Sequence, residues 1–279
     1  MKKKACKAFI VEGERREVGI IKNLEKNFFD DEDSLIITLP AGENIYMLWK
    51  QLKEDDFETD LIEVLKEGDE KIRKSLEGIS RDDFSEVFLF FDHDAHQNNL
   101  SSEDKSNIEG VSDIMESMLE SFDNETENGK LYISYPMVEA LRDFGYTDEG
   151  EEWFYKVADY SGYRKFSARR GRNTDFRKYS PDIWRMLIKE FVEKISFLWE
   201  TKELIEYEEY TEQVDPATVY KKQRQFGDRV LVLSAFPEFL LDYFKEEFWE
   251  ECVCYSSVEE WCEGYNVDKE KEEKLCTKK

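Results

Sequence analysis

The chain has 279 residues, and 65 acidic side chains against 40 basic ones give it a formal net charge of −25. Hydrophobic residues make up 40% and aromatic residues 14%, enough apolar surface to exclude a chain that is disordered throughout. The longest apolar runs end well before the roughly 20 residues that a membrane span needs, so we expect no membrane partner and a cytoplasmic location. Five cysteines without a CxxC pair favour free thiols, with a small zinc site near the C-terminal cysteines as the alternative.

The first half of the chain alternates strand-like runs with amphipathic patterns. Short runs rich in Val, Ile, Leu and Phe predict four strands, at residues 7–11, 34–39, 87–91 and 130–134. Apolar residues at helical spacing predict four helices, at 18–28, 46–52, 61–65 and 101–119. Buried strands separated by helices predict an α/β fold with a parallel sheet that helices cover on both faces.

The second half is expected to be mostly helical. Pro181 opens a long amphipathic pattern that reaches Trp199, and residues 216–226 predict a further helix. Residues 230–244 are strongly apolar but contain Pro237, which leaves two interpretations open: a kinked helix, or a strand followed by a helix.

A shift in composition near residues 145–150 and a charged C-terminal end suggest three parts. We expect a catalytic domain over 1–148, a mainly helical domain with a basic cluster over 149–265, and a charged, flexible tail over 266–279.

Acidic residues follow three of the predicted strands. Glu12 ends the first strand, Asp92 and Asp94 follow the third, and Glu139 lies just after the fourth. The carboxyl ends of parallel strands meet at one edge of the sheet, where α/β proteins bind their ligands. Because Mg²⁺ prefers carboxylate ligands, the pattern predicts a Mg²⁺ site there, with Mn²⁺ as the alternative ion. The simpler interpretation is that Asp92 and Asp94 only cap the following turn.

The order of these segments resembles the Toprim domain, the catalytic module of topoisomerases, primases, RecR-like repair proteins and several nucleases. The resemblance covers about the first half of the chain, in four segments: AFIVEGERRE (8–17), SLIITLPAG (34–42), VFLFFDHDAH (87–96) and LYISYPMVEAL (131–141). The last segment is most similar to Toprim nucleases of phage defence. These include the overcoming-lysogenization-defect nucleases and the stand-alone effectors of abortive-infection and PARIS-type systems.

The resemblance implies an acid–base role for Glu12, Mg²⁺ binding by Asp92 and Asp94, and a supporting acid at Glu139. Many members carry another acid four residues after the first Glu, where this chain has Arg16. Glu17 lies one step further, a rotation of about 100° around a helix, and Glu14 on the first turn is a second candidate.

Elimination within this family favours a nuclease. A topoisomerase needs a Tyr nucleophile on a separate large domain, and a primase brings zinc-binding and accessory domains. No GxxxxGK[ST] loop is present, so an ATPase partner would be a separate chain. The resemblance thus implies the toxic effector of an anti-phage system. We expect restraint through a separate ATPase chain or through the oligomeric state, with a second copy of this chain in a homodimer as the alternative partner. The alternative is a non-catalytic Toprim-like module that docks to such an ATPase.

Other enzymes also use a strand that ends in Asp-x-Asp. In haloacid-dehalogenase-like phosphatases the motif follows the first strand and continues to Thr or Val, where this chain has His96. Nucleotide-sugar glycosyltransferases would not account for the Glu12-Gly13 step or for the arginine cluster.

Positive charge is concentrated in one segment of this acidic chain. Between Tyr163 and Lys178 one acid opposes seven cations: Arg164, Lys165, Arg169, Arg170, Arg172, Arg177 and Lys178. Interleaved aromatic residues (Tyr163, Phe166, Phe176 and Tyr179) offer surfaces on which unpaired bases could stack. We therefore predict a nucleic-acid contact, with RNA such as tRNA favoured over DNA; partner docking and internal ion pairs are the alternatives.

Two further groups of side chains leave more than one interpretation open. A second basic cluster lies at Lys221, Lys222, Arg224 and Arg229. His93 and His96, beside the Asp-x-Asp motif, are either exposed loop residues or participants in phosphate binding and proton transfer.

Overall fold

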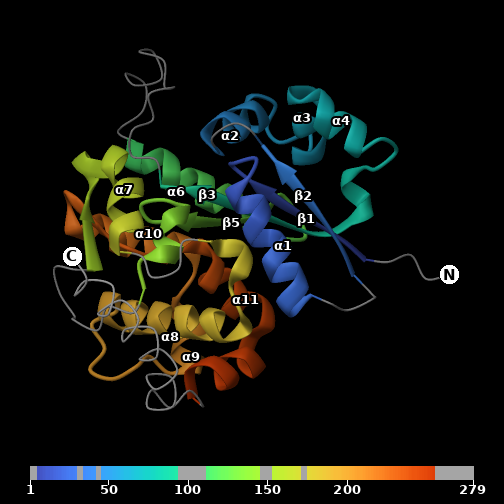
Figure 1. Cartoon of the computed structure of the whole chain (residues 1–279). Coiled ribbons are helices and arrows are strands. Elements are labelled where there is room, and N and C mark those ends of the chain that lie inside the picture. Colours follow the sequence, from blue (N-terminus) through green and yellow to red (C-terminus); the bar gives the residue numbers. More distant parts are fainter. Residues whose placement is uncertain are drawn as a thin grey trace, which may run out of the picture.

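The computed structural model describes residues 5–29, 34–41, 45–93, 111–144, 153–170 and 175–254. A five-stranded sheet with strand order β2-β1-β3-β5-β4 lies at the centre of the molecule (Figure 1). Four strands are parallel: β1 (Ala5–Val11), β2 (Ser34–Pro40), β3 (Phe84–Asp92) and β5 (Gly129–Ser134). The short β4 (Asp123–Asn124) pairs antiparallel with β5. All four predicted strands are present, and the predicted α/β class with a mostly parallel sheet is confirmed.

Helices join the strands; four of them match the apolar spacing, and the short one at Glu70–Ser75 was not predicted. They are α1 (Arg16–Phe28), α2 (Ile45–Glu54), α3 (Leu61–Gly68), α4 (Glu70–Ser75) and α6 (Val111–Ser121). The beginning of the helix predicted from residue 101 lies outside the described residues. Two 3-10 turns, Arg81–Asp83 and Val138–Arg142, precede β3 and follow β5.

The second half is mainly helical, as expected. Its helices are α7 (Tyr160–Arg170), α8 (Pro181–Leu198), α9 (Tyr207–Gln213), α10 (Pro216–Gln223) and α11 (Ala235–Trp249). A two-stranded antiparallel sheet joins β6 (Phe154–Lys156) to β7 (Arg229–Leu231). Short turns at Val157–Asp159, Phe176–Lys178, Arg224–Phe226 and Glu250–Cys254 connect or extend these elements.

The apolar segment that contains Pro237 is a strand followed by a helix. Ser234 caps α11 by accepting a hydrogen bond from the amide of Phe236, and Pro237 lies in the first helical turn. An amide there has no partner within the helix, so proline is tolerated.

The core extends from the central sheet into the second half of the chain. The ring of Phe239 on α11 meets those of Phe9 and Phe88, with ring centroids 5.3 and 4.9 Å apart. It also meets Tyr132 of β5 at 5.7 Å, so α11 covers one face of the sheet. The boundary predicted near residue 148 and the tail at 266–279 lie outside the described residues, and the domain division stays a prediction.

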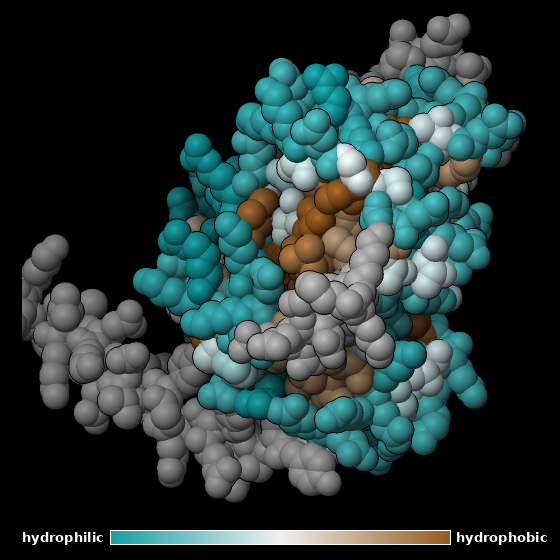
Figure 2. All heavy atoms as spheres, turned by 90° about the vertical axis from the view of Figure 1, so that its right-hand side faces the viewer, coloured by the Kyte–Doolittle hydropathy of each residue, from teal (hydrophilic) through white to brown (hydrophobic). Residues whose placement is uncertain are grey.

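The surface of the face in Figure 2 is mostly hydrophilic, with apolar atoms gathered in its middle. Among the described residues, the most exposed large apolar side chain is that of Leu35, 50% exposed, on the edge strand β2. Among the residues that the structure describes, no helix combines the length and apolar character that a membrane crossing requires.

Candidate metal and nucleic-acid site

The carboxyl ends of β1 and β3 form the topological switch point of the sheet. β1 pairs with β2 on one side and with β3 on the other, so the chain reaches β3 only by passing back over β1. Connections that leave neighbouring parallel strands in opposite directions open a crevice at their carboxyl ends, where α/β proteins bind ligands. Glu12 follows β1 and Asp92 ends β3, so the fold brings these two predicted site residues to that crevice.

Hydrogen bonds connect the predicted acids at this edge. The amide of Asp92 donates to Glu12 Oε2 at 3.2 Å, and the amide of Val138 donates to Asp92 Oδ1 at 2.7 Å. Glu139, the next residue, lies in the 3-10 turn that follows β5. Three of the four predicted acids therefore come together, whereas Asp94 lies outside the described residues.

A fourth acid at the site is Glu17, on the first turn of α1. Its side chain is buried and lies against Gly13, where an added Cβ would be only 2.8 Å from the carboxyl carbon of Glu17. The Glu12-Gly13 step thus leaves room for this carboxylate. Of the two candidates for the additional acid, Glu14 is exposed and lies 4.0 Å from Lys71, so Glu17 is the one that reaches the site.

Burial and repulsion from neighbouring acids raise the proton affinity of Asp92 and Glu17. Burial raises the pKa of Asp92 well above its ordinary value, and the charges of Glu12, Glu17 and Glu139 raise it further. Burial also raises the pKa of Glu17, with Glu139 adding to the effect and nearby arginines opposing it. Carboxyls that hold their protons because negative charge is crowded would ionise readily beside a cation.

Glu139 is fully buried and already neutralised by arginine. Its Oε1 accepts hydrogen bonds from Arg16 Nη1 and from Arg164 Nε, the latter at 3.0 Å. Its Oε2 has no hydrogen-bond partner among the described residues. Arg16 stands where the resembling family has an acid, and here it supplies a positive charge to the supporting carboxylate.

The carboxylates suit a hard divalent cation, although they are not arranged around one in the described part of the chain. There, no group of three or more His, Cys, Asp or Glu side chains has the spacing of a metal site. Glu12, Glu17 and Asp92 supply the oxygen ligands that Mg²⁺ prefers. Glu139, predicted as a ligand, instead has one oxygen bound to arginine and one oxygen unpartnered.

His93 is packed among aromatic rings. Its Nδ1 lies 2.8 Å from the Tyr160 hydroxyl, and its ring lies 5.1 Å from that of Tyr135. Burial lowers the pKa of His93 to about 4, so the ring is neutral at physiological pH. His93 is therefore not an exposed loop residue, while His96 lies outside the described residues.

The predicted basic cluster divides into two groups in the structure. Lys165 and Arg169 on α7 are exposed, and neither has an ion-pair partner among the described residues. Arg164, with 61% of its side chain exposed, extends from the same helix to Glu139 and links this cluster to the acids. Arg172 lies outside the described residues.

The other cations of the cluster have acidic partners. Arg177 and Lys178 pair with Asp175, at 2.8 and 3.6 Å, and remain largely exposed. Arg170 lies 3.3 Å from the buried carboxylate of Asp143, which also accepts a hydrogen bond from Tyr163. Internal ion pairing, one of the alternatives for this segment, therefore applies to Arg170.

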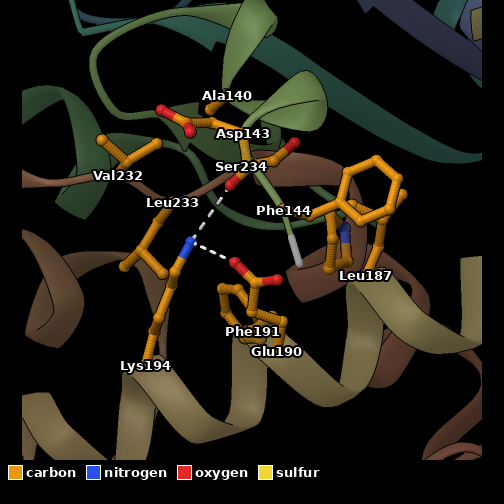
Figure 3. A pocket seen from close by; sticks show the side chains of 11 residues that line it. Ala140, Asp143, Phe144, Leu187, Glu190, Phe191, Lys194, Val232, Leu233 and Ser234 are labelled. Carbon is orange, nitrogen blue, oxygen red and sulfur yellow. Dashed lines mark hydrogen bonds and ion pairs between the residues drawn. The ribbon is translucent and has the colours of Figure 1, made fainter. Parts of the chain in front are cut away.

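Asp143 borders a small cavity between the turn after β5, α8 and α11. Figure 3 shows Lys194 extending toward Asp143 and Glu190; its Nζ is 2.7 Å from Glu190 Oε1 and 3.5 Å from the Asp143 carbonyl. The cavity has a volume of about 20 Å³, room for one water molecule. This cluster is a structural ion-pair network that holds α7 and α8 to the turn after β5.

Three of the four aromatic residues predicted to stack on bases are buried, and Phe166 is half-buried. Tyr163, Phe176 and Tyr179 are 0 to 4% exposed and belong to the core, so they offer no faces to nucleic-acid bases. Their spacing with the cations reflects packing of short helices. The prediction of aromatic stacking by these three residues is wrong.

The second basic cluster is also largely engaged within the protein. Lys221 and Arg224 pair with Glu116 of α6, at 3.0 and 3.2 Å. Lys222 lies over the ring of Trp199, and Arg229 lies over that of Phe154. These contacts favour a role in packing α10 and β7.

Cys252 is buried, and burial raises the pKa of its thiol to about 12. The alternative of a zinc site near the C-terminal cysteines stays a prediction. Cys262 and Cys276 lie outside the described residues.

Comparisons with known proteins do not assign this chain to a family. No protein-family model matches the chain, and neither the curated proteins nor the solved structures contain a significant match.

Proposed function

We propose that this chain is a metal-dependent nuclease of the Toprim type that hydrolyses phosphodiester bonds in nucleic acid. The observation that carries the proposal is the hydrogen bond between the Asp92 amide and Glu12 at the switch point, with Glu17 and Glu139 close enough to raise the pKa of Asp92. Mg²⁺, or Mn²⁺ in its place, would be held by Glu12, Asp92 and Glu17, with Asp94 as a further ligand.

A bound divalent cation supplies charge stabilisation to a phosphodiester and lowers the pKa of a bound water. The arginines beside Glu139 supply the complementary interaction with the substrate. Arg16 and Arg164 have 38% and 61% of their side chains exposed, so each can contact a phosphate from the solvent side. Lys165 and Arg169, exposed on the same helix as Arg164, extend the positive surface along the nucleic-acid backbone.

His93 is poorly suited to act as the general base of this reaction. Its Nδ1 is engaged with the Tyr160 hydroxyl, and its pKa of about 4 makes it a weak proton acceptor. Of the groups at the site, Glu12 is the best placed to accept a proton, since it lies at the end of β1 beside Asp92.

We base the proposed substrate on the net charge of the chain, and the proposed biological role on the Toprim resemblance. A net charge of −25 disfavours non-specific binding of duplex DNA, so we favour a structured RNA such as tRNA. The proposed setting is an anti-phage system in which a separate ATPase chain restrains this toxic effector. We also propose that the chain forms a homodimer.

The proposal is tested by incubating the purified chain with total tRNA and with supercoiled plasmid, in Mg²⁺ or in EDTA. We expect discrete tRNA fragments that disappear in EDTA and in Glu12→Gln. Glu14→Gln is the matched control because Glu14 is exposed and its carboxylate lies beside Lys71. Cleavage that persists in Glu12→Gln would contradict the proposal.

The arginine contacts of Glu139 favour a second candidate, a non-catalytic Toprim-like module that docks to an ATPase. A carboxylate with two guanidinium partners on one oxygen has part of its ligand capacity occupied. This candidate predicts neither Mg²⁺ binding nor cleavage, and its test is co-purification with an ATPase encoded in the same operon.

A further inference from the structure

A larger cavity lies on the face of the sheet that α11 covers, toward the amino end of β5. Its volume is about 380 Å³, which is in the range of small-molecule sites. Side chains from β5, α9, α11 and the start of α10 line it, among them Tyr132, Tyr207, Tyr210, Asp215, Glu238 and Asp242. The strand-end acids are not among its lining residues.

Glu238 is a buried acid in the wall of this cavity, and one of its two carboxyl oxygens is unpartnered in the described part of the chain. The residue is 4% exposed, and its Oε1 has no hydrogen-bond partner among the described residues. An unpaired polar atom in the interior costs about 1–3 kcal/mol, and natural proteins keep few of them. A carboxyl of this kind in the wall of a cavity indicates a ligand that supplies hydrogen-bond donors.

An ammonium group is already accommodated at one end of the cavity. Lys130 Nζ contacts the carboxylate of Asp242 and lies 5.8 Å from the centre of the Tyr132 ring. The Tyr132 hydroxyl donates a hydrogen bond to the same carboxylate. Carboxylate and tyrosine face together form the surroundings that proteins use for organic cations.

We propose that this cavity binds a small aliphatic amine, whose ammonium group pairs with Glu238 and lies against the rings of Tyr207 and Tyr210. The carbon chain of the ligand would pack on Val214, Pro216 and Leu241, which form the apolar part of the lining. This site is independent of the proposed nuclease reaction, because it shares no residue with the Glu12–Asp92 edge.

Binding of a cation at Glu238 has a proton signature. Burial, together with the negative charges of Asp242 and Asp215, raises the pKa of Glu238 to about 8, while Lys130 opposes the shift. The other ionisable groups of the cavity are Tyr132, Tyr207, Tyr210 and Lys245. At pH 7 the free carboxyl therefore holds its proton, and an ammonium ligand would release it.

Calorimetric titration of the full chain with putrescine, agmatine and spermidine tests the proposal. We expect saturable binding of at least one amine at 150 mM NaCl and none of 1,4-butanediol, which lacks the charge. In buffers that differ in ionisation enthalpy, close to one proton should be released per bound amine at pH 7.

Variants distinguish amine binding in the cavity from a general attraction of cations to this acidic chain. Glu238→Gln and Tyr207→Leu should each weaken amine binding about tenfold or more. Glu212→Gln removes an exposed acid of α9 outside the cavity and should leave the affinity unchanged. Absence of amine binding, or equal affinities in Glu238→Gln and Glu212→Gln, would overturn the proposal.

Discussion

The amide of Asp92 donates a hydrogen bond to the carboxylate of Glu12 across the 80 residues that separate them. The bond joins the ends of β1 and β3, where the connections of the sheet leave in opposite directions. It positions two acids of different strands at one point, and Glu17 and Glu139 add their negative charge there. The site therefore depends on the order of the strands and not on a contiguous motif.

The ion pairs of Glu139 with Arg16 and Arg164 predict that the free energy of unfolding depends on these two arginines. Replacing both Arg16 and Arg164 by Ala leaves a fully buried carboxylate without its two hydrogen-bond partners. We expect the free energy of unfolding to fall by about 2–3 kcal/mol in urea titrations, and Glu139→Gln in that background to restore most of it. A loss below about 0.5 kcal/mol would contradict this account of the two ion pairs.

Glu238 predicts a fall in stability with rising pH. Because its pKa is about 8 in the folded chain and 4.5 in the unfolded chain, only the folded chain keeps the proton between these values. The wild-type free energy of unfolding, relative to Glu238→Gln, should fall by about 1.4 kcal/mol per pH unit from pH 5 to pH 8. Urea titrations at four pH values measure the slope. Parallel curves for the two proteins would show that Glu238 ionises normally.

The burial of His93 predicts that its proton NMR signal does not change with pH near neutrality. The chain has two histidines, so His96→Gln leaves only His93 for proton NMR. Its pKa of about 4 means that the ring signal should stay constant from pH 5 to pH 8. Since only the unfolded chain binds this proton between about pH 4 and 6.5, His93 makes stability rise with pH in that window. A titration midpoint near 6.5 would contradict the buried, neutral state.

The two groups of cations on α7 predict opposite variant phenotypes. Lys165→Ala with Arg169→Ala should leave stability within about 0.5 kcal/mol and reduce the salt dependence of tRNA binding by about two phosphate contacts. Arg170→Ala should instead destabilise the chain by about 2 kcal/mol, since Arg170 pairs with the buried Asp143. Urea titration and filter binding at several salt concentrations measure both effects. Equal effects of the two sets of substitutions on stability and on tRNA binding would contradict the division of the α7 cations into two groups.

The sheet and the positions of the strand-end acids could be predicted from the sequence because both follow from local patterns. Apolar runs such as 87–91 are strands in the structure, and a parallel sheet brings residues after neighbouring strands to one edge. These two patterns are sufficient to place Glu12 and Asp92 at the same edge of the sheet. The choice between a kinked helix and a strand with a helix at Pro237 could not be made, since both satisfy the same apolar run.

The electrostatic partners could not be predicted because they depend on tertiary placement. Arg164 lies 25 residues from Glu139 along the chain and reaches it only because α7 packs on the turn after β5. Glu17 was one residue out of the expected position, yet the absence of a side chain at Gly13 lets its carboxylate reach the acids. Tyr163 and Phe176 alternate with cations in a way typical of either a binding surface or a short buried helix. Only packing distinguishes these two cases.

Calorimetric titration of the chain with Mg²⁺ at pH 7 tests the central claim, that the strand-end acids form a cation site. We expect saturable binding by wild type and Glu14→Gln with equal affinities, and binding at least about tenfold weaker in Glu12→Gln. Burial and the neighbouring acids raise the pKa of Asp92, and a bound cation opposes this shift, so proton release on Mg²⁺ binding should increase as the pH is lowered. Wild-type protein that binds no Mg²⁺, or a Glu12→Gln variant that binds it as tightly as wild type, would contradict the claim.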